Sequence, residues 1–130
     1  MVLSLDCIRD VLLAVESLDF GQCLTLDQLN EKLPTYEKKE LWYTCLQLYD
    51  GGFIKLMTIP MQHSEALGIK EIIDLTFSGH EFLNSIREDK NWDKIKSIAK
   101  AAGAYSLESI LQITKDVISQ AIKSAIAAHL

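Results

Sequence analysis

The chain has 130 residues, 48% of them hydrophobic, which is enough for one compact domain with a buried core but not comfortably for two. Its formal charge of −5 is unevenly distributed, because residues 1–80 carry six Lys or Arg against twelve Asp or Glu, whereas residues 81–130 carry seven against six. Proteins that bind nucleic acid usually present a basic face, so the acidity of the first part argues against that mode of action.

The cysteines and the two terminal segments of the chain indicate the cellular compartment that we expect. Cys7, Cys23 and Cys45 are odd in number and lie far apart without a Cys-x-x-Cys pair, so neither a disulfide framework nor a zinc site is indicated. Residues 1–10 lack the basic start of a secretion signal, and residues 106–130 contain charged side chains, among them Lys115, Asp116 and Lys123, unlike a membrane-spanning helix. We expect a soluble, cytoplasmic protein that does not contact membranes.

Helical patterns occur three times in the first fifty residues. Ser4 can cap a first helix, whose apolar residues recur at three- and four-residue steps and form one buried face. These residues are Leu5, Ile8, Leu12, Val15 and Leu18. Thr25 and Gln28 form the capping box of a short second helix, and Thr35 is predicted to cap a third that ends at the Asp-Gly-Gly of residues 50–52. Three helices in this order suggest a helix-turn-helix core.

A β-hairpin is predicted next. Residues 53–59 are rich in strand-forming side chains, and after a loop at residues 60–68 a second strand is predicted over residues 69–77. Its two-residue period places three apolar side chains on one face, namely Ile73, Leu75 and Phe77. Ser78 followed by Glu81 then predicts another capping box and a helix that packs back on the core.

The remainder of the chain is predicted to be helical. One helix restarts at Asn91 and stops at Gly103, and a final apolar helix begins at Ser106. The predicted buried stripe of the first of these helices is Trp92, Ile95 and Ile98. The fold class is therefore mainly α with a small β-hairpin: a winged-helix-like domain at residues 1–103, followed at residues 104–130 by an apolar helix for packing or dimerisation.

Four segments of the chain together resemble a known family. They are residues 8–16, 48–54, 75–83 and 86–96. The family comprises short, functionally uncharacterised proteins common in phages, prophages and conjugative elements of bacteria, and the resemblance spans roughly residues 3–100. It implies a winged-helix-like fold and a mobile-element origin, and it brings no catalytic or binding residues with it.

DNA binding is one functional hypothesis, with the third helix in the major groove and the hairpin as the wing. The candidate DNA-contacting residues are Tyr36, Lys38, Lys39, Tyr43, Thr44 and Gln47. The same helix also carries Glu37 and Glu40, and residues 57–68 of the wing contain no Lys or Arg to hold a phosphate. The alternative interpretation, a solvated helix face of mixed charge, is the stronger one for its two lysines.

Protein binding is the second hypothesis and narrowly leads. The wing contains apolar residues with little charge, and Met-rich exposed surfaces suit adaptable protein contacts. The candidate protein-binding residues are Met57, Ile59, Met61 and Leu67. In a mobile-element protein this would suit a modulator or inhibitor of a host or phage protein, such as a defence complex. The competing interpretation is that this loop folds onto its own core.

The final helix is a candidate for self-association because its polar positions form only a narrow stripe. The candidate dimer residues are Ile110, Val117, Ile118, Ala121, Ile122 and Ala125. Packing against the first helix is the alternative, and an interfacial membrane helix is disfavoured by the scarcity of basic and aromatic residues.

Catalysis has little support in the sequence. His63, His80 and His129 are isolated, and no phosphate-binding glycine loop, nucleophile elbow or metal-ligand spacing is present. Cys45 lies on the apolar face of the third helix, as a core residue would. We therefore expect a protein that is not an enzyme and needs no cofactor or metal.

Overall fold

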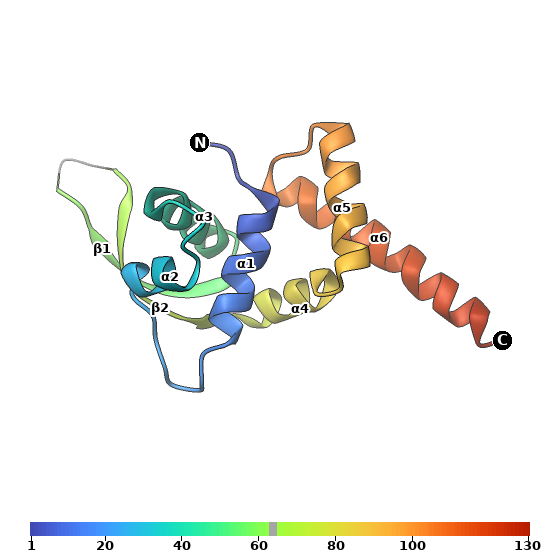
Figure 1. Cartoon of the computed structure of the whole chain (residues 1–130), viewed down its shortest axis with the longest axis horizontal. Coiled ribbons are helices and arrows are strands. Elements are labelled where there is room, and N and C mark those ends of the chain that lie inside the picture. The colour runs from blue at the N-terminus through green and yellow to red at the C-terminus, as the bar shows by residue number, and fades with distance from the viewer. Residues whose placement is uncertain (63–64) are drawn as a thin grey trace.

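The computed structural model describes residues 1–62 and 65–130, and in these it contains six helices and one two-stranded antiparallel sheet (Figure 1). The elements are α1 (Leu5–Glu16), α2 (Leu26–Lys32), α3 (Lys38–Asp50), β1 (Ile54–Pro60), β2 (Leu67–Leu75), α4 (Phe77–Ile86), α5 (Asp89–Ala102) and α6 (Leu107–Ala128). Helices α1 to α3 and the hairpin form one half of the molecule, and α4 to α6 form the other (Figure 1). The predicted fold class, mainly α with a hairpin and winged-helix-like, is confirmed.

Helix α1 holds the two halves together, since it contacts α2, α3 and β2 on one side and α4 on the other. Five of its residues are buried: Cys7, Ile8, Val11, Leu12 and Val15. Because α1 is covered from two sides, its buried stripe is wider than the predicted one. Each fully buried aliphatic side chain contributes about 1.5–3 kcal/mol to the free energy of folding. The predicted cap is confirmed, because the backbone N–H of Cys7 donates to Ser4 Oγ at 3.4 Å.

The cap of α2 also follows the sequence pattern. The N–H of Gln28 donates to Thr25 Oγ1 at 3.1 Å, and the N–H of Thr25 donates to Gln28 Oε1 at 2.9 Å. Both bonds of the predicted capping box are therefore present, and they satisfy N–H groups that an isolated helix end leaves without partners.

The predicted start of α3 at Thr35 is wrong. The helix begins at Lys38, and its N-cap side chain makes no hydrogen bond. The reason lies in Tyr36, whose hydroxyl donates to Asp10 of α1 at 2.6 Å and whose carbonyl accepts from Asn30 Nδ2 of α2 at 2.9 Å. These two contacts hold the α2–α3 connection in a turn and delay the helix.

The predicted apolar face of the second strand is also wrong. The pairing register shifts between Lys55 and Leu56 of β1, which leaves Ile73 as an extra residue in β2. Such a bulge interrupts the two-residue alternation of side chains. The buried apolar side chains of the strand are consequently Ile72 and Leu75, three positions apart, while Ile73 is half-buried.

The third residue of that predicted face, Phe77, belongs to α4 instead and is 80% exposed. The cap of this helix is Thr76, whose Oγ1 accepts from the N–H of Gly79 at 3.0 Å, so the predicted capping box of Ser78 and Glu81 is wrong. Thr76 and Ser78 are both hydroxyl residues that can cap a helix, and the strand before them ends two residues earlier than predicted.

Helix α5 begins two residues before the predicted Asn91 and stops as predicted at Gly103, whose φ of 64° is left-handed. Its buried residues are Trp92, Ile95 and Ala99. Ile98 was predicted in this stripe but is 39% exposed, because the helix turns Ala99 to the core at that level.

Helix α6 is capped by Ser106 as predicted, with the N–H of Ser109 donating to its hydroxyl at 3.1 Å. The first half of α6 packs on α4 and α5, whereas its second half projects away from the rest of the molecule (Figure 1). None of the helices in the described parts of the chain has both the length and the apolar character needed to cross a membrane.

Candidate functional site

A groove lies between the wing and helices α2 and α3. We call it the wing groove. It has a volume of about 230 Å³, and its lining includes Lys38, Trp42, Ile59, Met61 and Ile69. One wall is fixed, because the indole Nε1 of Trp42 donates to the carbonyl of Leu67 in β2 at 2.8 Å. Helix α3 and the hairpin are therefore joined at the groove.

The four predicted protein-binding residues lie on the exposed surface of the wing. Met57, Ile59, Met61 and Leu67 are between 39% and 44% exposed, so their side chains are not part of the core. Gly68, which is buried, permits this packing: a Cβ at this position would lie 2.8 Å from Ile59 Cγ1 and 2.9 Å from Met61 Sδ. The absence of a side chain there lets two of the four apolar residues close over the strand.

Charge is sparse around the wing groove. Residues 57–68 carry no Lys or Arg, and the exposed Lys55 and Lys70 lie on the strands that flank them. At the edge of the groove Lys38 forms an ion pair with Asp27 of α2, with its Nζ 2.6 Å from Oδ1. The groove is therefore an apolar surface whose lysine already has a counter-ion.

Thr44 was predicted to contact DNA, and the structure removes it from that set. Its side chain is only 1% exposed. The hydroxyl donates to the carbonyl of Glu40 at 2.8 Å and lies 3.3 Å from Cys7 Sγ of α1. It faces the core because α1 packs against this side of α3, so it is not accessible to a ligand.

The remaining predicted DNA-contacting residues have unequal access. Tyr36 precedes the helix, and its hydroxyl is bound to Asp10; burial and this bond raise the pKa of the phenol. Tyr43 packs against the core and is half-buried, and Lys38 is held by its ion pair. The exposed polar side chains of the set are Lys39 and the ion-paired Lys38, and Gln47 is half-buried.

The cysteines and histidines do not assemble into a reactive site in the described residues. Burial raises the pKa of the Cys7 thiol to about 11 and that of the Cys45 thiol to about 12, so both remain protonated and poorly nucleophilic at neutral pH. His80 and His129 are exposed, and His63 lies outside the described residues. Within those residues, no three His, Cys, Asp or Glu side chains are placed to hold a metal ion.

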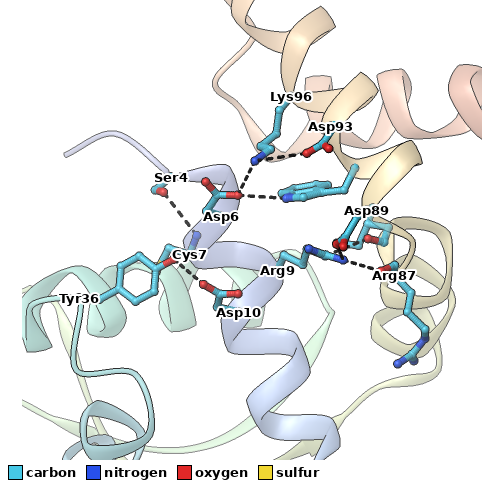
Figure 2. Close-up of polar contacts among 12 residues, drawn as sticks. Ser4, Asp6, Cys7, Arg9, Asp10, Tyr36, Arg87, Asp89, Asp93 and Lys96 are labelled. Carbon is cyan, nitrogen blue, oxygen red and sulfur yellow. Dashed lines mark hydrogen bonds and ion pairs between the residues drawn. The ribbon is translucent and has the colours of Figure 1, made fainter.

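A polar cluster that the sequence did not predict joins α1 to α4 and α5 (Figure 2). Arg9 donates through Nε to the carbonyl of Ile86 at 3.0 Å and through Nη2 to the carbonyl of Arg87 and to Asp89, the last at 2.8 Å. Its guanidinium also lies 5.9 Å from the ring centre of Trp92. The arginine satisfies carbonyl groups that the end of α4 would otherwise leave without donors.

Asp6 extends this cluster along α1 (Figure 2). Its Oδ1 accepts from Trp92 Nε1 at 3.1 Å and from Lys96 Nζ at 3.0 Å. Partial burial alone would raise the pKa of Asp6, but these hydrogen bonds and the lysine charge together lower it. Because every group in the cluster is engaged with another part of the chain, we assign it a structural role in docking α5 onto α1.

The predicted dimer residues of α6 divide into two groups. Ile110 and Val117 are buried within the monomer against α4 and α5, so the prediction that they form an intermolecular contact is wrong. Ile118 and Ala121 are half-buried, and Ile122 and Ala125 are exposed. The helical period had placed all six together because it does not show where along α6 the neighbouring helices end.

Comparison with known proteins gives two similarities. The model of the family described as "Hypothetical protein (DUF2513)" matches residues 3–106. An "Uncharacterized protein" from Haemophilus influenzae is 28% identical over 116 residues, which covers 88% of this chain and 93% of that protein. No solved structure matches the chain.

Proposed function

The chain belongs to the DUF2513 family, and we propose that it acts without catalysis, by binding a protein partner at the wing groove. The observation that supports this is the exposure of four large apolar side chains on the wing, Met57, Ile59, Met61 and Leu67, which are 39–44% exposed; Ile59 and Met61 among them line the wing groove. Contiguous exposed apolar surface is uncommon on monomeric proteins unless a partner covers it.

The chemistry of the groove favours an apolar protein segment as its occupant. At about 230 Å³ it is smaller than a typical small-molecule site, for which roughly 300–1,000 Å³ is usual, but it has room for one or two side chains. Two flexible methionines can adjust to such side chains, while Trp42 supplies a fixed aromatic wall. A phosphate-bearing ligand would meet no Lys or Arg on residues 57–68.

The resemblance to proteins of phages and conjugative elements supports a further part of the proposal. We place the partner among host or phage proteins, such as a defence or transcription complex that the bound chain modulates or inhibits. The site of action would be the cytoplasm, where three free cysteines remain reduced. Self-association of the chain into a homodimer completes the proposal.

A winged-helix DNA-binding regulator is the second candidate, and Lys39 is the observation that favours it. This lysine is exposed on α3, the helix that enters the major groove in winged-helix DNA complexes. Against it, the N-cap residue of α3 is the acidic Glu37, and residues 57–68 of the wing contain no Lys or Arg. We therefore rank DNA binding below protein binding.

The test compares three variants of the full chain as bait in bacterial lysate, with and without nuclease. Met61→Asp/Leu67→Asp alters the apolar surface of the wing, Lys39→Glu alters the DNA candidate, and Ile98→Asp is the control because it introduces aspartate at an apolar side chain of about equal exposure on α5. We expect one discrete protein to survive nuclease treatment with wild type, Lys39→Glu and Ile98→Asp. Loss of two central apolar contacts should weaken its retention on the wing variant at least about tenfold.

Two results would contradict the proposal. If the wing variant retains the same protein as strongly as wild type, the wing groove is not the binding site. If the retained material is a defined DNA fragment, and if both nuclease and the Lys39→Glu substitution abolish its retention, the chain is a DNA-binding regulator.

A further inference from the structure

The second half of α6 carries apolar side chains that nothing in the described monomer covers. Ile122 is 54% exposed and Ile126 is 57% exposed, and this end of the helix projects beyond α4 and α5 (Figure 1). The two isoleucines are four residues apart and so lie on one face of the helix, next to Ile118. We call residues 121–128 the free half of α6.

A groove runs between α4 and residues 111–123 of α6, and we call it the α4–α6 groove; its far end is lined by Ile122 and Lys123 of the free half. It consists of a hollow of about 330 Å³ at the start of α4 and one of about 400 Å³ toward the free half. The two hollows are continuous, because Ser85, Thr114 and Lys115 line both. Phe77, Phe82 and Leu111 make the first hollow apolar, and Ile118 and Ile122 do the same for the second.

We propose that two copies of the chain associate antiparallel through α6, so that the free half of each lies in the α4–α6 groove of the other. The α4–α6 groove and the free half lie on the same helix. A two-fold axis beside Ile118 therefore relates two identical contacts, each between the free half of one copy and the groove of the other, and the assembly closes as a dimer. Ile122, four residues beyond the axis, is then level with Thr114 of the second copy. Ile126 is level with Ile110, at the hollow lined by Leu111 and Phe82.

Charge complementarity supports this partner and this direction. Glu81 lines the first hollow of the groove and Lys123 lies on the free half, and neither forms an ion pair among the described residues. Within one chain the two line different hollows: Glu81 lines the first and Lys123 the second, eight residues or about 12 Å along α6 from Lys115, which lines both. In the antiparallel dimer Lys123 is level with residue 113 of the second copy, where Glu81 lines the groove.

The apolar area that this contact would bury is the size expected for a reversible dimer. Phe77, Ile122 and Ile126 are 80%, 54% and 57% exposed, and with the partly exposed Leu111 and Ile118 they offer roughly 400 Å² of apolar surface per copy. Two copies would bury about 800 Å² of apolar surface in addition to the polar flanks, an area in the range of weak, transient interfaces, which bury less than about 1,200 Å². We therefore expect micromolar self-association rather than a permanent dimer.

The first test is sedimentation velocity of the full chain from about 1 to 300 µM. Wild type should pass from the monomer mass of 14.6 kDa to twice that mass with rising concentration. Ile122→Asp/Ile126→Asp should remain monomeric, whereas Ile98→Asp, an exposed isoleucine on α5, should dimerise like wild type. A wild type that stays monomeric at 300 µM, or a double variant that still dimerises, overturns the proposal.

The second test is a charge exchange that reports the antiparallel geometry. Glu81→Lys and Lys123→Glu should each weaken the dimer about five- to tenfold, and the double variant should return to within about twofold of wild type. Loss of dimer without recovery in the double variant overturns the proposed register. Far-UV circular dichroism establishes that each variant is folded. The inference is independent of the wing groove, since Met61→Asp/Leu67→Asp should leave the dimer intact.

Discussion

Gly79→Ala should strongly destabilise the protein, although alanine is normally the better residue in a helix by about 1 kcal/mol. Gly79 lies in the first turn of α4 and is buried. A Cβ added there would lie 2.0 Å from the carbonyl oxygen of Phe53 and 3.0 Å from its carbonyl carbon. Both are backbone atoms, so no side-chain rotation can relieve the overlap.

The expected magnitude follows from what must move. Restoring normal contact requires about 1 Å of separation between Phe53 and α4, which breaks the hydrogen bond of 3.0 Å from the N–H of Thr76 to the Phe53 carbonyl. It also disturbs the contact between the rings of Phe53 and Phe82, whose centres are 5.4 Å apart. Overpacking typically costs about 1–3 kcal/mol and the lost hydrogen bond adds about 1, while the helix preference of alanine offsets about 1, so we expect a net loss of about 1–3 kcal/mol.

Urea unfolding followed by circular dichroism measures this loss. With a slope of about 1–3 kcal/mol per molar urea, the midpoint should fall by roughly 1–3 M. Ser78→Ala is the matched control, because it adds the same residue one position earlier at an exposed site, and it should change stability by less than about 0.5 kcal/mol. A Gly79→Ala protein as stable as wild type, or more stable, would refute the close approach of Phe53 to α4.

Two further predictions concern titratable groups. The hydrogen bond from Arg87 lowers the pKa of Glu16 below 4.5, so this contact stabilises the fold above that pH and is lost as the pH falls through the lowered value. The urea midpoint of Glu16→Gln should thus lie below that of wild type at pH 7 and converge with it in acid; a constant difference would exclude this linkage. In the native protein Ellman's reagent should react promptly with Cys23, which is half-buried, and with Cys7 and Cys45 only after unfolding. Prompt reaction of all three thiols would show that the core opens.

Local sequence signals predicted most helix boundaries. They failed at boundaries that are set by contacts with other elements of the fold. Thr25 caps α2 as predicted because its partner is three residues away. Thr35 does not cap α3, because Tyr36 is held by α1 and α2, twenty-six and six residues away. The bulge at Ile73 follows from pairing with β1, which no two-residue period reveals. Sequence reasoning recovers interactions within one turn and misses those made across the fold.

In the candidate sites, too, some features are visible in the local sequence and others arise only from contacts made across the fold. The wing residues could be proposed from the sequence alone because residues 57–68 combine large apolar side chains with no Lys or Arg. The role of Trp42 was missed, since its hydrogen bond to Leu67 joins α3 to the hairpin only after folding. Arg9 was missed for the same reason, because its acceptors lie more than seventy residues away. A single charged residue on the polar side of a helix gives no sequence signal for such a cluster.

The positions of the two proposed surfaces bear on how they would act together. The wing lies at one end of the molecule and the free half of α6 at the opposite end (Figure 1). A dimer formed through α6 therefore leaves both wing grooves uncovered and directs them outward. If the protein partner is itself oligomeric, binding of the first wing raises the effective concentration of the second, and the dimer holds its partner more tightly than either groove alone. A reversible dimer would then couple the strength of partner binding to the concentration of the chain.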